Sequence, residues 1–379
     1  MPFQLLGLPN SFTATLHTQQ YSSPTPIQQQ AIPAILKGKD VLAIAPTGSG
    51  KTASYVLPIL TNLQKNDVPK NRHVNVLVLV PTRELAVQVE TVFKTFAKAL
   101  PKPTKILAVY GGVSINPQMM GMRGVSVLIA TPGRLLELIT ENAVQLSNVS
   151  TLVLDEADKM LNQGFKVELD AVLAVLPVRV QNLLFSATLT NDVNNITQLL
   201  LNNPLVIKIA PEENTIDLIT QLAYTVPEEK KGPLLRHLIR SEEMKQVLIF
   251  TSSVAKCDSV ADKLRKNGID AQSINSKKNQ GERTEVLSKF KAGKLQVLVA
   301  TDLIARGIDI KFLPYVINYE LPRSPKDYIH RIGRTGRAET AGHAISFVTT
   351  ADEHHFKIIQ KKMGKQVPMI DATTLTITK

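Results

Sequence analysis

The sequence predicts an α/β protein of two units, each a mainly parallel sheet flanked by helices. Short runs rich in Val, Ile and Leu alternate with amphipathic stretches, which is typical of buried parallel strands and the helices that cover them. The length of 379 residues suits about two domains of ~150 to 200 residues each. The alternation lapses over 209–217, so we expect a short linker there, between a first unit at 1–208 and a second at 218–379.

The composition is that of a soluble globular protein, with 44% hydrophobic and 20% charged residues. No apolar run approaches the ~18 to 20 residues of a membrane span, and the N-terminus lacks the features of a signal peptide, so we expect a cytoplasmic location. The single cysteine, Cys257, excludes an internal disulfide and a cysteine zinc site.

The net charge of +12 indicates a polyanionic partner, of which nucleic acid is the commonest. The excess is uneven, because residues 1–205 carry a net +4 and residues 206–379 a net +8. Charge alone is weak evidence, since a basic surface can simply keep a protein in solution.

In the first unit, polar residues follow each predicted strand. The strands are expected at 41–44, 76–80, 106–110, 127–130, 152–154 and 183–185, and the polar segments at 46–52, 81–84, 111–112, 131–134, 155–158 and 186–188. Because ligands of parallel α/β sheets bind at the carboxyl ends of the strands, we expect these segments to converge on one surface. The second unit repeats the alternation, with strands at 247–250, 272–274, 297–300, 316–319 and 345–348 and helices at 254–266 and 281–291.

The stretch between the first strand and a helix at 52–63 predicts a phosphate cradle. It reads Ala45-Pro46-Thr47-Gly48-Ser49-Gly50-Lys51-Thr52. Gly48 and Gly50 let backbone N–H groups turn inward, Lys51 supplies a positive charge, and Thr52 offers a hydroxyl to Mg²⁺. The alternative is an ordinary glycine-rich turn that opens a helix. The strand before and the helix after are the context that the cradle requires.

Two charged segments complete a candidate site for nucleotide hydrolysis. Asp155 and Glu156 follow an apolar run, where one carboxylate reaches a nucleotide-bound Mg²⁺ and the next polarises a water. The alternative is a solvated acidic helix start. His330, Arg331, Arg334 and Arg337 lie within eight residues that also hold two glycines, which predicts a loop that clamps phosphates rather than a plain basic face.

The ordered set of motifs resembles the DEAD-box RNA helicases of superfamily 2, since Asp155-Glu156-Ala157-Asp158 spells DEAD. The resemblance covers the chain from Phe3 to about Val348 and implies two RecA-like domains in a monomer that uses ATP and Mg²⁺ and binds RNA. The end of the chain, 361–379, is too short for an accessory domain.

The resemblance implies a role for each matching residue at the ATP site. Phe3, Tyr21 and Gln28 would recognise adenine, Asp309 the ribose, and Thr47, Gly48, Ser49, Gly50, Lys51 and Thr52 the phosphates and Mg²⁺. Asp155 would order the metal through its waters, and Glu156 would be the general base. Arg334 and Arg337 match arginine fingers, while Asp158, Ser186, Thr188, His330 and Arg331 match residues that couple hydrolysis to RNA.

The RNA contacts implied by the resemblance are mainly backbone amides, hydroxyls and arginines. They are Pro81, Thr82, Arg83, Gly112, Thr131, Gly133 and Arg134 in the first unit, with Thr251, Arg283, Thr301 and Asp302 in the second. Such groups bind phosphate and sugar, so binding should be independent of base sequence. Contacts to 2′-OH groups would favour RNA over DNA. The alternative for any one of these residues is a turn or a helix cap.

The chain departs from the family pattern in two places. Asn275-Ser276 stands where many relatives have His-Gly, although Gln280 and Arg283 are retained, and Gln20 stands where the family often has Gly.

Four functions stay open at this point: an RNA helicase, an ATP-gated RNA clamp that unwinds little, a DNA helicase, and a P-loop small-molecule kinase. A kinase has no use for a second α/β domain that ends in paired arginines.

Overall fold

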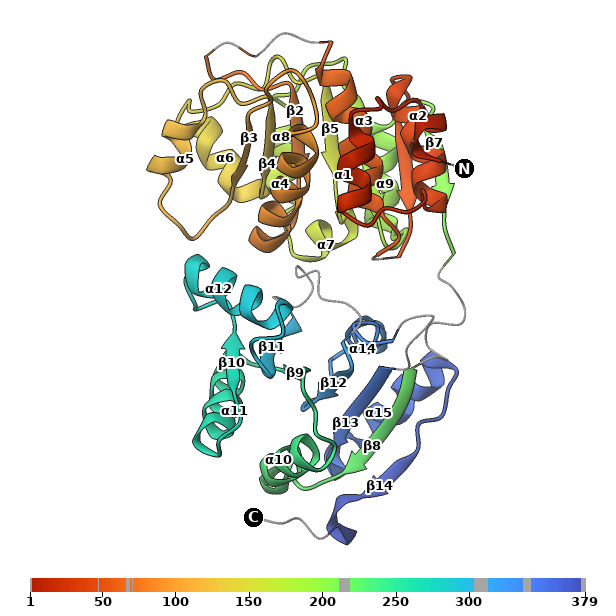
Figure 1. Cartoon of the computed structure of the whole chain (residues 1–379), viewed down its shortest axis with the longest axis vertical. Helices are drawn as coiled ribbons and strands as arrows, with labels where there is room; N and C mark the ends of the chain where they lie inside the picture. Colours follow the sequence, from red (N-terminus) through yellow and green to blue (C-terminus); the bar gives the residue numbers. More distant parts are fainter. Residues whose placement is uncertain are drawn as a thin grey trace. The chain divides into compact units, whose positions relative to one another are not determined.

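The chain divides into two compact units, Met1–Pro211 and Glu212–Lys379, which we call unit 1 and unit 2 (Figure 1). This computed structural model describes residues 2–46, 48–65, 69, 71–210, 219–302, 313–336 and 342–375. The linker predicted at 209–217 falls mostly outside these residues. Within them, no helix has both the length and the apolar character needed to cross a membrane.

Unit 1 is a seven-stranded parallel sheet flanked by helices, with the strand order β3-β4-β2-β5-β6-β1-β7. Its strands are β1 (Val41–Ile44), β2 (Val76–Leu79), β3 (Ile106–Val109), β4 (Val127–Ala130), β5 (Thr151–Leu154), β6 (Gln181–Ser186) and β7 (Leu205–Lys208). Its helices are η1 (Phe3–Leu6), α1 (Phe12–Thr18), α2 (Pro26–Leu36), α3 (Lys51–Leu63), α4 (Arg83–Ala97), α5 (Asn116–Gly121), α6 (Pro132–Thr140), α7 (Ala157–Asn162), α8 (Lys166–Leu173) and α9 (Asn191–Leu200).

Unit 2 repeats this architecture with the strand order β10-β11-β9-β12-β13-β8-β14, again parallel. Its strands are β8 (Ile219–Thr225), β9 (Val247–Thr251), β10 (Ala271–Ile274), β11 (Val297–Thr301), β12 (Tyr315–Asn318), β13 (Gly342–Val348) and β14 (Met369–Asp371). Its helices are η2 (Glu228–Lys230), α10 (Lys231–Ser241), α11 (Val254–Lys266), α12 (Gln280–Lys291), α14 (Pro325–Ile332), η3 (Thr350–Asp352), α15 (Glu353–Met363) and η4 (Ala372–Thr374).

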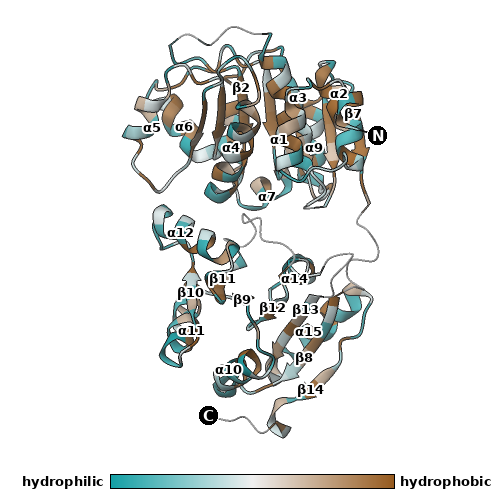
Figure 2. Ribbon diagram, in the orientation of Figure 1, coloured by the Kyte–Doolittle hydropathy of each residue, from teal (hydrophilic) through white to brown (hydrophobic). Residues whose placement is uncertain are grey.

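Each sheet is apolar on both faces, which is why its strands read as continuous apolar runs (Figure 2). In β2, Val76 and Val78 belong to one core cluster, whereas Leu77 and Leu79 belong to the cluster on the opposite face. Alternate residues of a strand point to opposite faces, so both must be apolar when helices cover both sides. The polar residues are therefore left to the strand ends and loops.

The eleven strands predicted from apolar runs are all present, and most bounds differ by one residue. Three strands were missed: β7, β8 and β14. β8 reads ITQLAYT and has no long apolar run, while β7 and β14 are sheet-edge strands whose side chains are mostly exposed. Edge strands need no continuous apolar run because they are covered less completely.

The expectation of a loop at His330 and Arg331 is wrong, because both residues lie in the last turn of α14. Ser324 caps this helix by accepting a hydrogen bond from the Asp327 backbone N–H, and Pro325 occupies its first position. The helix ends before Gly333. The glycines therefore limit the helix at Ile332 but do not unwind the residues that precede them.

The buried Cys257 gives a prediction for the fold. Its thiol lies on α11, donates to the Val299 carbonyl at 3.1 Å, and is fully covered. Burial raises its pKa to about 12, so the thiolate fraction at pH 8 falls by roughly a thousandfold. We expect a colorimetric thiol reagent at pH 8 to react at least about a hundredfold more slowly with the folded chain than with the denatured chain. Rapid labelling of folded protein would contradict this packing.

Candidate functional site

The loops that follow β1, β2, β4, β5 and β6 meet at the carboxyl edge of the unit 1 sheet, as expected for parallel strands. Side-chain contacts join them in pairs. Tyr55 of α3 reaches Asp155 after β5, and Thr188 after β6 reaches Asp158. Arg134 of α6 donates to the Val113 carbonyl at 2.8 Å.

The loop between β1 and α3 has the backbone of a phosphate cradle. Gly48 and Gly50 have φ angles of 93° and 94°, which are sterically unfavourable for residues that carry a side chain. Lys51 begins α3, is 7% exposed, and folds its ammonium back onto the Ala45 carbonyl at 2.6 Å and the Pro46 carbonyl at 3.3 Å. Burial lowers the pKa of Lys51, although the charges of Asp155 and Glu156 oppose that shift. Thr47 lies outside the described residues.

Gln28 joins α2 to the cradle. It is fully buried, its amide donates to the Gly50 carbonyl at 3.2 Å, and its oxygen accepts from the Thr25 backbone N–H at 3.0 Å. Thr25 also donates to the Ser49 carbonyl at 2.7 Å. Gln28 is therefore not a solvent-facing helix residue. A Cβ at Gly50 would lie 2.5 Å from the Gln28 amide nitrogen, so this close approach requires glycine.

Phe3 and Tyr21, predicted to recognise adenine, lie together. Their ring centroids are 6.3 Å apart in an edge-to-face arrangement, and Tyr21 meets Phe96 of α4 at 5.8 Å in the same way. Phe3 is 5% exposed, so most of its ring serves the core of unit 1. The two rings therefore also tie the N-terminal segment to α4.

Asp155 is a buried carboxylate with two hydrogen-bond donors. Tyr55 donates its hydroxyl to Oδ2 at 2.8 Å, and the Glu156 backbone N–H donates to Oδ1 at 2.9 Å. Burial, and then the charge of Glu156, raises the pKa of Asp155 to about 6, while Lys51 and the hydrogen bond from Tyr55 lower it. The acidic pair is therefore not a solvated helix start. Sequence reasoning missed Tyr55, whose signal is its place one helical turn after Lys51 and Thr52 on α3.

Glu156 has a strained backbone and a partly engaged side chain. Its φ and ψ angles of 54° and 45° are left-handed, which is uncommon for a residue with a side chain. Oε1 forms an ion pair with Lys159 at 2.7 Å, and both side chains are 12% exposed. Oε2 is buried and has no hydrogen-bond partner among the described residues. An acceptor in this state suits a water molecule beside Asp155.

The segments after β5 and β6 are hydrogen-bonded to each other. Thr188 donates its hydroxyl to Asp158 Oδ2 at 2.8 Å, and Ser186 donates to the Thr188 carbonyl at 2.8 Å. Asp158 and Ser186 are both buried. The predicted coupling residues of unit 1 therefore form one connected group next to Glu156.

The residues predicted to bind RNA in unit 1 differ in their exposure to solvent, and one of them caps a helix. Thr82 caps α4 by accepting from the Leu85 backbone N–H at 3.3 Å, which is the structural alternative considered above. The Arg83 guanidinium lies where a Cβ on Gly112 would be, and Gly112 has a φ angle of 74°. Gly112 is exposed, Arg83 and Gly133 are half-buried, and the buried members are Pro81, Thr82, Thr131 and Arg134.

In unit 2, the buried side chain of Arg331 contacts residues at the ends of several strands. It is 2% exposed, donates to both oxygens of Asp302 at 2.6 and 2.7 Å, and reaches the Asn318 side chain and the Glu320 carbonyl. Its guanidinium also lies 4.9 Å from the Phe250 ring centroid. The carboxylate of Asp302 is therefore engaged within unit 2.

The other predicted residues of unit 2 are mostly covered. Arg334 is 8% exposed, and its backbone carbonyl accepts from the Leu313 N–H at 3.0 Å. Thr251 is fully buried and Arg283 is 3% exposed, so neither presents much side-chain surface, whereas Thr301 and His330 are half-buried. Asp309 and Arg337 lie outside the described residues.

Both departures from the family pattern have a local explanation. Asn275 is buried, donates to Asp258 at 2.8 Å and accepts from the Lys277 backbone N–H at 3.1 Å, so it fixes the turn after β10 with its own side chain. Gln20 has a φ angle of 59°, the left-handed region that glycine enters most easily. The family's frequent glycine at that position fits this backbone.

Comparison with known proteins agrees with this geometry. Residues 25–196 match the family described as DEAD/DEAH box helicase, and residues 230–339 match the helicase conserved C-terminal domain. The chain is 38% identical over 374 residues to the DEAD-box ATP-dependent RNA helicase CshA of Bacillus cereus, covering 98% of this chain and 70% of that protein.

Solved structures support the same assignment. Saccharomyces cerevisiae Dbp5 bound to RNA and ADP BeF3 matches with a TM-score of 0.82 at 29% identity, over 98% of this chain and 95% of the other. A DEAD box protein from the hyperthermophile Methanococcus jannaschii matches with a TM-score of 0.54 at 34% identity, over 98% and 99%. The two sheets are thus RecA-like domains, and the chain belongs to the DEAD-box helicase family.

Proposed function

We propose that this protein is an RNA-dependent ATPase that hydrolyses ATP to ADP and phosphate and unwinds short RNA duplexes locally, without sequence preference. The observation that carries the proposal is the buried pair Asp155 and Glu156 beside Lys51, at the carboxyl edge of the unit 1 sheet. The names of the similar proteins, an ATP-dependent RNA helicase and an RNA-bound Dbp5, support RNA as the second ligand.

The cradle residues fit a nucleoside triphosphate. Backbone N–H groups of 48–52 and the Lys51 ammonium would hold the phosphates, and the ammonium would leave the Ala45 and Pro46 carbonyls to do so. Thr52 and Asp155 would hold Mg²⁺, whose charge offsets that of the phosphates when it is bound. Tyr55 fixes the carboxylate of Asp155 in place for this role.

Glu156 would act as the general base. Its Oε2 has no partner in the described part of the chain and would accept a proton from the attacking water, while Lys159 holds Oε1. Arg334 and Arg337 would stabilise charge that develops on the phosphates. Arg331 would serve as a positioning residue, because its contacts with Asp302 fix the helix that precedes Arg334.

RNA would bind through its phosphates and sugars to the loops after β2, β3 and β4 in unit 1, with further contacts from unit 2. If one strand is held in a conformation that a duplex cannot adopt, its partner is displaced, and phosphate release would then free the strand. We also propose that the protein acts as a monomer in the cytoplasm.

ATP turnover with and without RNA tests the proposal. We expect slow hydrolysis by the protein alone and stimulation by single-stranded RNA, with weaker stimulation by DNA of the same sequence. Strand separation of a short RNA duplex, with and without ATP, then distinguishes a helicase from an ATP-gated clamp. A lack of RNA stimulation would contradict the proposed function.

Gly50→Ala tests the close contact between the cradle and Gln28. We expect ATP affinity to fall at least about tenfold, because the new methyl group would displace the Gln28 amide or the loop. Gly38→Ala is the matched control: Gly38 has a similar positive φ of 75°, but nothing lies within 4 Å of its added Cβ. Both variants should lose ~1–2 kcal/mol of stability from backbone strain. Equal loss of ATP affinity in both would argue against a role for the contact.

Glu156→Gln tests the base. We expect kcat of ATP hydrolysis to fall roughly 100-fold or more, with ATP affinity changed little. Because this change also breaks the ion pair with Lys159, Lys159→Gln is the control that breaks the pair and keeps the carboxylate. Normal turnover by Glu156→Gln would show that Glu156 is not the base, and an equal loss in Lys159→Gln would assign the loss to the broken ion pair rather than to the carboxylate.

A further inference from the structure

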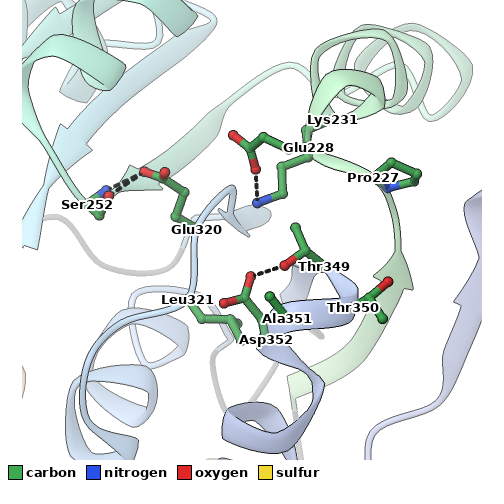
Figure 3. Close-up of a pocket in the computed structure, with 10 residues that line it drawn as sticks. All are labelled: Pro227, Glu228, Lys231, Ser252, Glu320, Leu321, Thr349, Thr350, Ala351 and Asp352. Carbon is green, nitrogen blue, oxygen red and sulfur yellow. Dashed lines mark hydrogen bonds and ion pairs between the residues drawn. The ribbon is translucent and has the colours of Figure 1, made fainter.

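Side chains link neighbouring loops at the carboxyl edges of both sheets. In unit 2, Glu320 after β12 accepts hydrogen bonds from the backbone N–H and the hydroxyl of Ser252 after β9, both at 2.7 Å (Figure 3). In unit 1, Thr188 after β6 donates to Asp158 after β5. Each of these links joins the segments after two adjacent strands. The edge strand β3 has a neighbour, β4, on one side only, so the loop that follows it has no second strand to be linked to.

Gln118 of α5 supplies the missing link to the loop after β3. Its side-chain oxygen accepts from the Tyr110 backbone N–H at 3.0 Å, and its side-chain nitrogen donates to the Tyr110 carbonyl at 3.3 Å. An amide side chain can thus pair with a backbone N–H and C=O as an adjacent strand would. The same nitrogen donates to the Ser114 carbonyl at 3.2 Å. Gln118 therefore joins the two ends of the loop 111–113.

Two arginines hold this loop from other elements. Arg134 of α6 is 6% exposed and donates to the Val113 carbonyl at 2.8 Å. The guanidinium of Arg83 from α4 lies against Gly112, where it fills the space that a Cβ would need. The loop after β3 is therefore fixed by side chains from α4, α5 and α6.

We infer that Gln118 is a positioning residue for RNA binding, which holds the backbone of Gly111 and Gly112 in the conformation that receives the strand. This role rests on the proposed function, in which the loop after β3 binds RNA. Glycines have no side chain, so RNA can contact only their backbone, and the backbone conformation decides the geometry of that contact. A loop that is already ordered loses less conformational entropy when its ligand binds.

The hydrogen bonds of Gln118 favour a positioning role over a direct contact with RNA. An amide side chain has two N–H donors, and those of Gln118 are directed to the carbonyls of Tyr110 and Ser114. Its oxygen accepts from the backbone of Tyr110. The polar groups of this side chain thus serve the loop itself.

Gln118→Ala and Gln118→Met test this role in the full chain. Both remove the three hydrogen bonds, and methionine keeps the length of the side chain. With a single-stranded uridine oligonucleotide, we expect the RNA concentration for half-maximal ATPase stimulation to rise at least about fivefold. The rate at saturating RNA should fall by less than about twofold, because the residues around the phosphates are unaltered. Fluorescence anisotropy of the labelled oligonucleotide, with a non-hydrolysable ATP analogue, should show the same loss of RNA affinity.

Gln64→Ala is the matched control. Gln64 accepts from the Lys102 backbone N–H at 3.0 Å and donates to the Lys102 carbonyl at 3.4 Å, so it makes the same pair of bonds as Gln118 makes with Tyr110. It follows α3, and Lys102 precedes β3, which places this pair at the amino edge of the sheet. We expect a similar decrease in thermal unfolding temperature in Gln64→Ala and Gln118→Ala, but an unchanged RNA requirement in Gln64→Ala.

The outcomes separate this role from the proposed function. An unchanged RNA requirement in both Gln118 variants, with normal stimulation of the unaltered chain, would overturn the role of Gln118 alone. An equal rise in Gln64→Ala would also overturn it, because the effect would then come from lost stability. If RNA failed to stimulate the unaltered chain, the proposed function would be wrong and this role with it.

Discussion

The burial of Asp155 at the end of β5 is the constraint on which the proposed ATP-binding edge of the unit 1 sheet depends. A carboxylate removed from water is costly unless donors and opposite charge surround it. Tyr55 from α3 and the backbone of Glu156 supply the donors, and Lys51 supplies the charge. The same requirement holds α3 against β5, so the loop that precedes α3 is fixed by a residue about a hundred positions further along the chain.

Much of this arrangement could be predicted from the sequence, because parallel strands covered on both faces must be continuous apolar runs and must leave polar residues at their ends. Gly48, Gly50 and Lys51 were identified from local pattern alone. Tyr55 was not, because a tyrosine on a helix face that is otherwise apolar resembles a core residue until its partner across the sheet is known. The glycines after Arg331 predict a loop, but the cap at Ser324 and Pro325 starts a helix that extends through Arg331.

The two units show how far strand order determines function. Both sheets have the same order, and both put a buried lysine after the strand second from one edge. In unit 1 glycines precede that lysine and leave backbone N–H groups for an anion, whereas in unit 2 Glu228 neutralises it. Topology fixes where a ligand can bind, and a few loop residues decide whether that position keeps donors free for an anion.

The contacts of Arg331 join several strands of unit 2 to the segment that carries Arg334. One guanidinium joins Asp302 after β11, Asn318 of β12, the Glu320 carbonyl and the ring of Phe250 in β9, while its backbone carbonyl accepts from the Arg334 N–H at 3.1 Å. Arg331 is buried but the Asp302 side chain is 27% exposed, so breaking this pair costs less than the about 3–5 kcal/mol of a fully buried one. A shift of Asp302 at the end of β11 would therefore also move Arg331 and the segment that carries Arg334.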